Sequence, residues 1–113
     1  MKRKFRLRKS TEFQRVRRYG KSYAHPLIVL VVLPNEQECS RIGIVAGRLM
    51  GNAVRRNRTK RLMRAALQPL LLRIAPGWDM ILIARQSLQR ASFQQTQAAL
   101  LALFEHARLF VDR

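Results

Sequence analysis

The residues best suited to chemistry lie in one segment, GNAVRRNRTKRLMR, at positions 51–64. On a helix, four of its polar residues share one face at spacings of three and four: Asn57, Lys60, Arg61 and Arg64. The opposite face can dock on a sheet, because it holds Thr59, Leu62, Met63, Ala66 and Leu67. Neighbouring side chains on such a face lie about 5–6 Å apart, which is comparable to the spacing of phosphates along a nucleic-acid strand. The segment therefore predicts a helix that binds a phosphate backbone.

Three further arginines flank this face: Arg55, Arg56 and Arg58. Arg55 and Arg56 fall near the expected helix N-terminus, where cations oppose the helix dipole and cost stability unless an anion lies beside them. Guanidinium groups bind phosphate through two hydrogen bonds and stack on bases, so an arginine-rich face favours RNA. The alternative is a basic face that only keeps the domain in solution. That role favours mixed charges, whereas residues 41–64 contain no acid.

The chain is poorly equipped to cleave RNA by itself. A metal-dependent phosphodiesterase needs clustered carboxylates. The six acids are instead scattered along the sequence, at Glu12, Glu36, Glu38, Asp79, Glu105 and Asp112. A metal-free nuclease would need His25 and His106, which fall in different predicted elements, and Lys60 has no evident carboxylate partner to make it a base. We therefore predict no catalytic residue, no metal site and no bound cofactor in this chain.

The composition indicates a polyanionic partner. The 113 residues include 23 Lys and Arg against 6 Asp and Glu, for a net charge of +17, yet 48% are hydrophobic. This is enough apolar material for one folded domain over residues 1–113. Ten basic residues lie in 1–21 and eight in 41–64, and we expect residues 1–9 to form a flexible basic arm. Nucleic acid is the expected partner and an acidic membrane surface is the competing one.

The membrane alternative fails on length. The longest apolar run, at 27–33, has seven residues, whereas a spanning helix needs about 20. No apolar stretch follows the basic N-terminus, so it does not form a signal peptide. A single cysteine, Cys39, excludes an internal disulfide and fits a reducing compartment. We expect a cytoplasmic protein without a membrane or small-molecule partner.

The elements that must position the basic segment follow from the hydrophobic pattern. We expect a first helix capped by Ser10 and ended at Gly20, and a last helix that begins with a Ser92–Gln95 capping box. Between them we expect extended segments at 23–24 and 27–33, a strand at 41–46, a helix at about 52–72 that bends near Pro69, and a strand at 79–84. This α-β-β-β-α-β-α order predicts a single α+β domain with helices packed on a small sheet.

The segment 51–64 resembles the RNR motif of the bacterial ribonuclease P protein component, G-N-A-V-x-R-N-R-x-K-R-x-x-R. Flanking matches follow in the family's order: Arg6-Leu7 and Phe13 before the motif, RIGI at 41–44, and DMILIAR at 79–85. The resemblance covers about residues 5–110. It implies an α/β sandwich with a left-handed β-α-β crossover between strands 41–46 and 79–84.

The resemblance also implies a function. The protein would bind one ribonuclease P RNA, which uses Mg²⁺ to remove the 5′ leader of precursor tRNA. The residues implied for RNA-subunit binding are Asn52, Arg55, Arg56, Asn57, Arg58, Lys60, Arg61 and Arg64. A cleft between the sheet and the first helix would hold the leader, with candidates Arg6, Phe13, Arg17 and Arg48. Phe13 is either a stacking platform or a core residue, and a small ribosomal or nucleoid protein is the alternative function.

Three positions depart from the family pattern. Gly47, Arg48 and Leu49 stand where many members have Ser-Lys-Lys, so one cation remains there. Ala65 follows Arg64 where a glutamate is usual, and Arg17 stands where some members have a second aromatic residue. These departures predict a leader cleft that depends more on charge and less on stacking.

Overall fold

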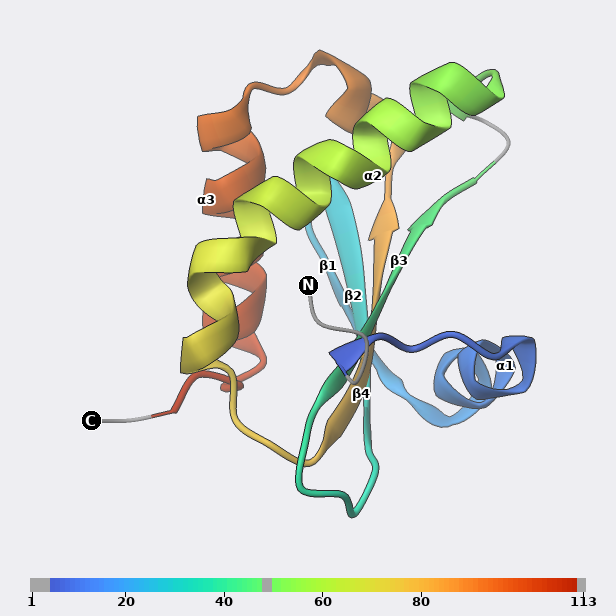
Figure 1. Cartoon of the computed structure of the whole chain (residues 1–113). Coiled ribbons are helices and arrows are strands. Elements are labelled where there is room, and N and C mark those ends of the chain that lie inside the picture. The colour runs from blue at the N-terminus through green and yellow to red at the C-terminus, as the bar shows by residue number, and fades with distance from the viewer. Residues whose placement is uncertain (1–4, 48–49, 112–113) are drawn as a thin grey trace.

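The computed structural model describes residues 5–47 and 50–111 of the chain. It forms one α+β domain in the predicted order of elements (Figure 1). The helices and strands are α1 (Ser10–Tyr19), β1 (Lys21–Ala24), β2 (Ile28–Pro34), β3 (Arg41–Ala46), α2 (Ala53–Leu67), β4 (Trp78–Ala84) and α3 (Phe93–His106). Two short 3₁₀ helices, η3 (Gln68–Arg73) and η4 (Gln86–Arg90), follow α2 and β4. The predicted fold class is confirmed.

The four strands form one mixed sheet in the order β1-β2-β4-β3. β2 pairs antiparallel with both β1 and β4, whereas β3 and β4 are parallel neighbours joined through α2. In Figure 1 both strands run upward and α2 passes on the viewer's side, while the chain moves leftward from β3 to β4. This is the left-handed sense, in agreement with the family expectation and opposite to the usual right-handed crossover.

Helices cover both faces of the sheet. One face holds the main core beneath α2 and α3, where strand residues such as Ile28, Leu30 and Leu82 are fully buried (Figure 1). The other face carries a smaller cluster, in which Leu7 and Val16 pack on Val31 and Ile81. Because side chains alternate along a strand, the apolar runs of β2 and β4 supply both clusters. The molecule is therefore a three-layer sandwich in which, among the described residues, α1 is the helix on the second face.

The face beneath α1 is built from three rows of side chains that cross β2, β4 and β3 in register. The first row is Leu33, Asp79 and Arg41; the second is Val31, Ile81 and Gly43; the third is Val29, Ile83 and Val45. Leu7, Phe13 and Val16 pack on the cluster that the second row contributes. The third row stays half-buried, and we call Val29, Ile83 and Val45 the open stripe.

The structure corrects two expected helix boundaries. Ser10 is the first residue of α1 rather than its cap, because the Glu12 carboxylate accepts a hydrogen bond from the Lys9 N–H at 3.2 Å. The second helix ends as an α-helix at Leu67, and the tighter η3 continues it through Pro69, whose ring nitrogen has no hydrogen to donate. The Ser92–Gln95 capping box of α3 is confirmed, with reciprocal hydrogen bonds of 2.9 and 3.0 Å.

Candidate nucleic-acid interface

The start of α2 is fixed by two local features. Gly51 has a φ of +97°, a left-handed conformation that a glycine adopts without strain. The Asn52 side chain then accepts a hydrogen bond from the Arg55 N–H at 3.0 Å and caps the helix. Asn52 is one of the predicted RNA contacts, and its side-chain oxygen also caps the helix. The cap therefore fixes where α2 begins.

One side of α2 is buried on the main core through Thr59, Met63, Ala66 and Leu67. The remaining circumference carries six cations that we call the basic face: Arg55, Arg56, Arg58, Lys60, Arg61 and Arg64. Within residues 5–47 and 50–111, none of these six side chains forms an ion pair or a hydrogen bond. Removing such charges from water without a partner is costly, so the arrangement favours a polyanion as the partner.

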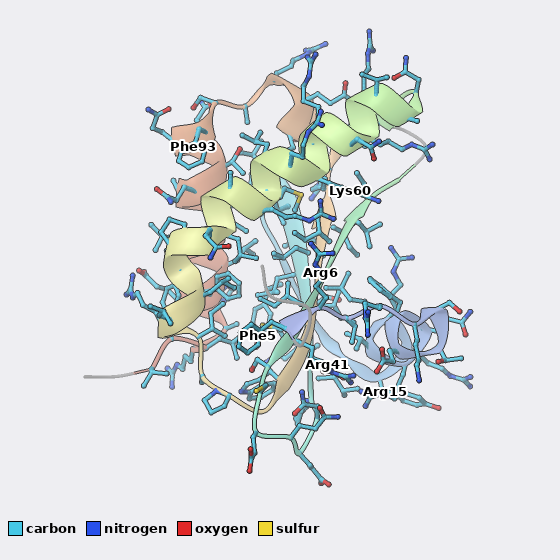
Figure 2. The ribbon with its side chains drawn as sticks, in the orientation of Figure 1. Phe5, Arg6, Arg15, Arg41, Lys60 and Phe93 are labelled. Atoms are coloured by element: carbon cyan, nitrogen blue, oxygen red, sulfur yellow. The ribbon has the colours of Figure 1, made fainter. Side chains whose placement is uncertain are left out.

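The basic face is wider than the narrow ladder that helical spacing predicts. Arg61 and Asn57 are exposed at its centre, beside Val54, which is 64% exposed. Three cations are half-buried on one flank: Arg56, Lys60 and Arg64. Figure 2 shows Lys60 on the side of α2 that faces β3. Arg55 and Arg58 lie on the opposite flank, where they line a cavity next to η4. The helix therefore presents cations in two directions.

Two acids that lie far apart in the sequence meet at one arginine. Arg41 donates hydrogen bonds to both carboxylate oxygens of Asp79, at 2.9 and 2.7 Å, and also pairs with Glu12. Arg15 on α1 binds Asp79 at 2.5 Å, and Asn35 donates to it at 2.8 Å. Figure 2 places Arg15 and Arg41 close together beside α1. We call Glu12, Arg15, Arg41 and Asp79 the ion network, and it fastens α1 to β3 and β4.

The ion network changes the acidity of its carboxylates. Burial alone would raise the pKa of Asp79, but the hydrogen bonds from Arg41 and Asn35 and the nearby positive charges outweigh it and lower that pKa. Burial also opposes ionisation of Glu12, yet hydrogen bonds from the Lys9 backbone and from Arg41 lower its pKa. Both acids are therefore charged at neutral pH. Arg15 and Arg41 form their ion pairs with these acids, within the protein.

Phe13 lies between the two roles considered for it. Its side chain is half-buried, and its ring covers Gly43 on β3 so closely that a Cβ at Gly43 would lie 2.3 Å from the ring. One side of the ring is thus packed against the strand. The ring also belongs to the cluster that includes the open stripe. Phe13 is a fixed aromatic group between α1 and the uncovered part of the sheet.

The other leader candidates are distributed around the same face. Arg6 is exposed and bridges to Ile42, while the Leu7 N–H donates to the Ile42 carbonyl at 3.0 Å, so this segment runs along the outer edge of β3. Arg17 is exposed on α1, one turn after Phe13. Arg48 lies outside the described residues. The structure thus brings Phe13 and Arg17 together on one helix and places Arg6 at the neighbouring sheet edge.

The two histidines have structural contacts. The His25 Nδ1 accepts a hydrogen bond from the Leu27 N–H at 3.0 Å in the turn before β2. The His106 ring packs edge-on against Tyr23, with ring centroids 5.2 Å apart. Across residues 5–47 and 50–111, no three side chains of the metal-binding types His, Cys, Asp and Glu form a group. In the same part of the chain, no helix has the length and apolar character needed to cross a membrane.

Comparison with known proteins decides the family. The family model described as Ribonuclease P matches residues 1–108. The ribonuclease P protein component of Herpetosiphon aurantiacus is 42% identical over 113 residues, which cover 100% of this chain and 92% of that protein. The chain belongs to the ribonuclease P protein family. The ribonuclease P match includes both α1 with Phe13 and the whole basic face of α2.

Solved ribonuclease P proteins share the fold. The protein from Staphylococcus aureus superposes with a TM-score of 0.85 at 32% identity, covering 95% of this chain and 98% of its own. The protein from Thermotoga maritima superposes with a TM-score of 0.81 at 32% identity, covering 89% of this chain and 96% of its own. The recognition made from the RNR segment is therefore confirmed.

Sequence reasoning missed two parts of this site. It treated Glu12 and Asp79 as isolated acids, although they are joined through Arg41. It also gave Arg90 no role, although η4 brings this residue to the cavity beside α2. Neither was visible in the sequence, because Asp79 and Arg41 face each other only once the parallel strands are in register.

Proposed function

We propose that this chain, as the protein subunit of ribonuclease P, binds the RNA subunit through the basic face of α2. The observation that carries this proposal is the set of six cations on one helix without an internal ionic partner among the described residues. Their charges would release counterions from an RNA backbone, which provides affinity without requiring a base sequence. We expect one protein per RNA subunit.

We further propose that the 5′ leader of precursor tRNA lies along the open stripe beside α1. Phe13 provides an aromatic surface there, while Arg17 on α1 and Arg6 at the edge of β3 provide exposed cations. Single-stranded RNA binds where aromatic rings and cations alternate, because bases stack while phosphates pair. The open stripe is apolar and half-buried, so it suits ribose and base faces better than phosphates.

We assign the cleavage itself to the RNA subunit, with Mg²⁺ as its metal. The acids most nearly grouped, Glu12 and Asp79, are engaged with arginines, and His25 accepts a backbone hydrogen bond. These contacts leave those groups poorly placed to activate water. The single cysteine, Cys39, is half-buried and unpaired, which supports a cytoplasmic setting.

Reconstitution tests these proposals. Purified protein added to ribonuclease P RNA at low Mg²⁺ is expected to restore cleavage of precursor tRNA, because the basic face replaces cations that the RNA otherwise needs. Protein that binds the RNA without changing cleavage would contradict the proposed role. Cleavage by the protein with no RNA subunit present would instead contradict the assignment of catalysis to RNA.

A further inference from the structure

A cavity of about 810 Å³ lies between the N-terminal half of α2 and η4. Three arginines from two elements line it: Arg55 and Arg58 of α2, and Arg90 of η4. The amides of Gln86 and Gln89 add neutral polar groups. None of the nine described residues that line the cavity is acidic. The cavity therefore concentrates positive charge at a place where the protein supplies no counter-charge.

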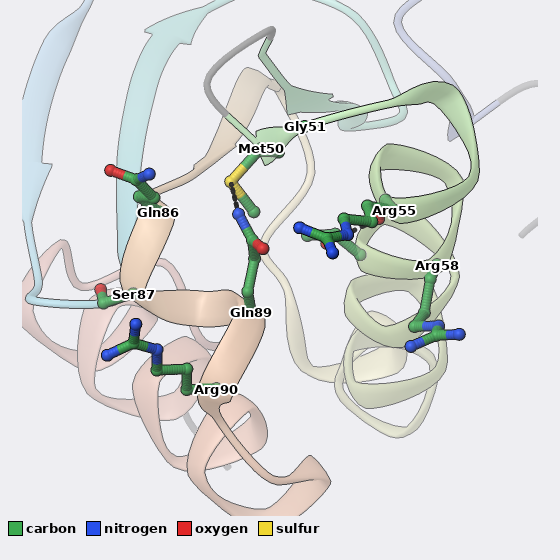
Figure 3. A pocket seen from close by; sticks show the side chains of 9 residues that line it. Met50, Gly51, Arg55, Arg58, Gln86, Ser87, Gln89 and Arg90 are labelled. Carbon is green, nitrogen blue, oxygen red and sulfur yellow. Dashed lines mark hydrogen bonds between the residues drawn. The ribbon is translucent and has the colours of Figure 1, made fainter.

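Arg55 is directed toward this cavity by its own backbone environment. A Cβ added at Gly51 would lie 3.0 Å from the Cδ of Arg55, so the stem of Arg55 packs over the glycine. The Arg55 N–H donates to Asn52, and its carbonyl accepts from the Thr59 hydroxyl at 3.0 Å. Figure 3 shows the guanidinium of Arg55 extending from α2 toward Gln89. Its orientation is thus set by packing and not by an acidic partner.

The opposite wall, η4, is held firmly enough to form a site. Leu88 is fully buried in the main core, and the Ser87 hydroxyl donates to the Pro26 carbonyl at 2.7 Å. The Gln89 amide donates to the Met50 sulfur at 3.7 Å, a weak contact that leaves the amide oxygen available (Figure 3). Arg90 is exposed and its side chain makes no hydrogen bond or ion pair with the described residues.

These features call for an anion larger than a lone ion. Figure 3 shows the Arg55 guanidinium directed across the cavity, whereas Arg58 and Arg90 extend from its two edges. Phosphate oxygens accept the paired hydrogen bonds of a guanidinium well. The volume falls within the range of about 300–1,000 Å³ in which small ligands are enclosed. We propose that this cavity holds one phosphodiester unit of the RNA subunit, with Arg55 on its phosphate, Gln89 beside its ribose or base, and Arg58 and Arg90 at the edges of the cavity facing the adjoining phosphates. This inference depends on the function proposed above.

The position of the cavity favours the RNA subunit over the leader as the source of this phosphate. Met50, which lines the cavity, belongs to the main core on the α2 side of the sheet, and Thr59 is buried on the same side of α2. The open stripe lies on the opposite side, beside α1. The sheet therefore stands between the cavity and the open stripe, whereas the cavity continues directly into the basic face through Arg55 and Arg58.

The test compares Arg90→Gln with the matched variant Arg108→Gln, which removes the same charge beyond the far end of α3. Binding of each variant to the RNA subunit alone is measured over a series of salt concentrations. Arg90→Gln is expected to bind about tenfold more weakly. It should also reduce the salt slope, which is the slope of log affinity against log salt concentration, by about one. Arg108→Gln is expected to change the affinity by less than about twofold. Arg90→Lys should keep the slope but lose part of the affinity, because it cannot form two parallel bonds to phosphate.

Each contrary result has a distinct meaning. Equal binding by Arg90→Gln and Arg108→Gln, with thermal unfolding unchanged in both, would overturn the inference. A loss that appears only when the assembled enzyme binds leader-bearing precursor tRNA would also overturn it, because the phosphate would then belong to the leader. Failure of the unmodified protein to bind or stimulate the RNA subunit would contradict the proposed function itself.

Discussion

Gly43 and Phe13 show how one missing side chain can position an aromatic group. The Phe13 ring occupies the space that a Cβ on Gly43 would fill, with ring atoms 2.3 and 2.4 Å from that position. Any residue with a side chain at position 43 would push the ring away from the sheet. The glycine therefore determines how deep the aromatic group sits beside the open stripe.

Phe13→Ala is expected to weaken binding of leader-bearing precursor tRNA by about 1–3 kcal/mol if a base stacks on the ring. Affinities for precursor tRNA and for leaderless tRNA, measured with the assembled enzyme, provide the check. Gly43→Ala should produce the same pattern, because its methyl group displaces the ring without removing it. An equal loss for both RNAs, or unfolding of the protein, would identify Phe13 as a core residue.

Asp79 is the residue on which the attachment of α1 depends. Its side chain is fully buried, and Arg15, Arg41 and Asn35 all donate to it. Asp79→Asn leaves Arg41 with Glu12 as its one ionic partner among the described residues. We expect the free energy of unfolding to fall by about 3 kcal/mol. This is at the low end for a buried pair, because water screens the partly exposed Arg15. Urea unfolding at neutral pH measures it, with exposed Glu38→Gln as a control that should change little.

The ion network also predicts the response to acid. The pKa values of Asp79 and Glu12 are lower in the folded protein than the ordinary 3.8 and 4.5, so the network stabilises the fold fully at pH values above these. Stability is lost as pH falls through the folded pKa values, because protonation then favours the unfolded chain. The free energy of unfolding should therefore fall below about pH 5, and less steeply in Asp79→Asn. An identical slope in the variant would contradict this.

At the scale of elements, α2 is a helix with one buried side and cations around the rest of its circumference. The buried side of α2 is narrow and consists of Thr59, Met63, Ala66 and Leu67. Most of the helix circumference can therefore carry cations. Two arginines near its N-terminus oppose the helix dipole, and Asn52 offsets this through its cap. A helix of this composition gains most of its stability from docking on the sheet and from bound anions.

Arg61→Gln and Arg64→Gln are each expected to weaken RNA-subunit binding and to lower the salt slope by about one unit. Each change removes one phosphate contact while keeping a good helix-forming residue. The slope of log affinity against log salt concentration is the measurement, and Arg108→Gln serves again as the control. Unchanged slopes for both variants would mean that the basic face is not the interface.

The sequence allowed most elements to be predicted, because their signals are local. The apolar run of β2, the Ser92–Gln95 box and the periodicity of 53–67 each specify one element by themselves. The crossover between β3 and β4 is left-handed and follows from family resemblance, since the general preference is right-handed. The ion network and the cavity could not be predicted, because Arg41 meets Glu12, and Arg55 meets η4, only once the layers are assembled.

For the whole molecule, the dominant property is a net charge of +17 on 113 residues. Among the described residues, the ion network compensates Arg15 and Arg41, while the basic face has no acidic partner. Like charges on one small surface repel and destabilise the folded state. The free protein should therefore be less stable than its apolar core would suggest.

Ionic strength is expected to act in opposite directions on folding and on RNA binding. Raising it from about 0.01 to about 0.15 M shortens the screening length from about 30 to about 8 Å, which should raise the melting temperature of the free protein. The same change should weaken RNA binding, because each counterion released into a more concentrated salt solution gains less entropy. Thermal unfolding and binding measured across one salt series test both effects. A melting temperature that is constant or falls would show that self-repulsion is not significant.

The three-layer arrangement, with the sheet between the two proposed RNA surfaces, would make the protein a bivalent adaptor. If α2 is bound to the RNA subunit, the open stripe on the other side of the sheet is held at one fixed place in the complex. Capture of the leader is then an intramolecular event, governed by an effective concentration in the millimolar range. A few apolar side chains and one aromatic ring can therefore hold a leader that they would bind only weakly in free solution.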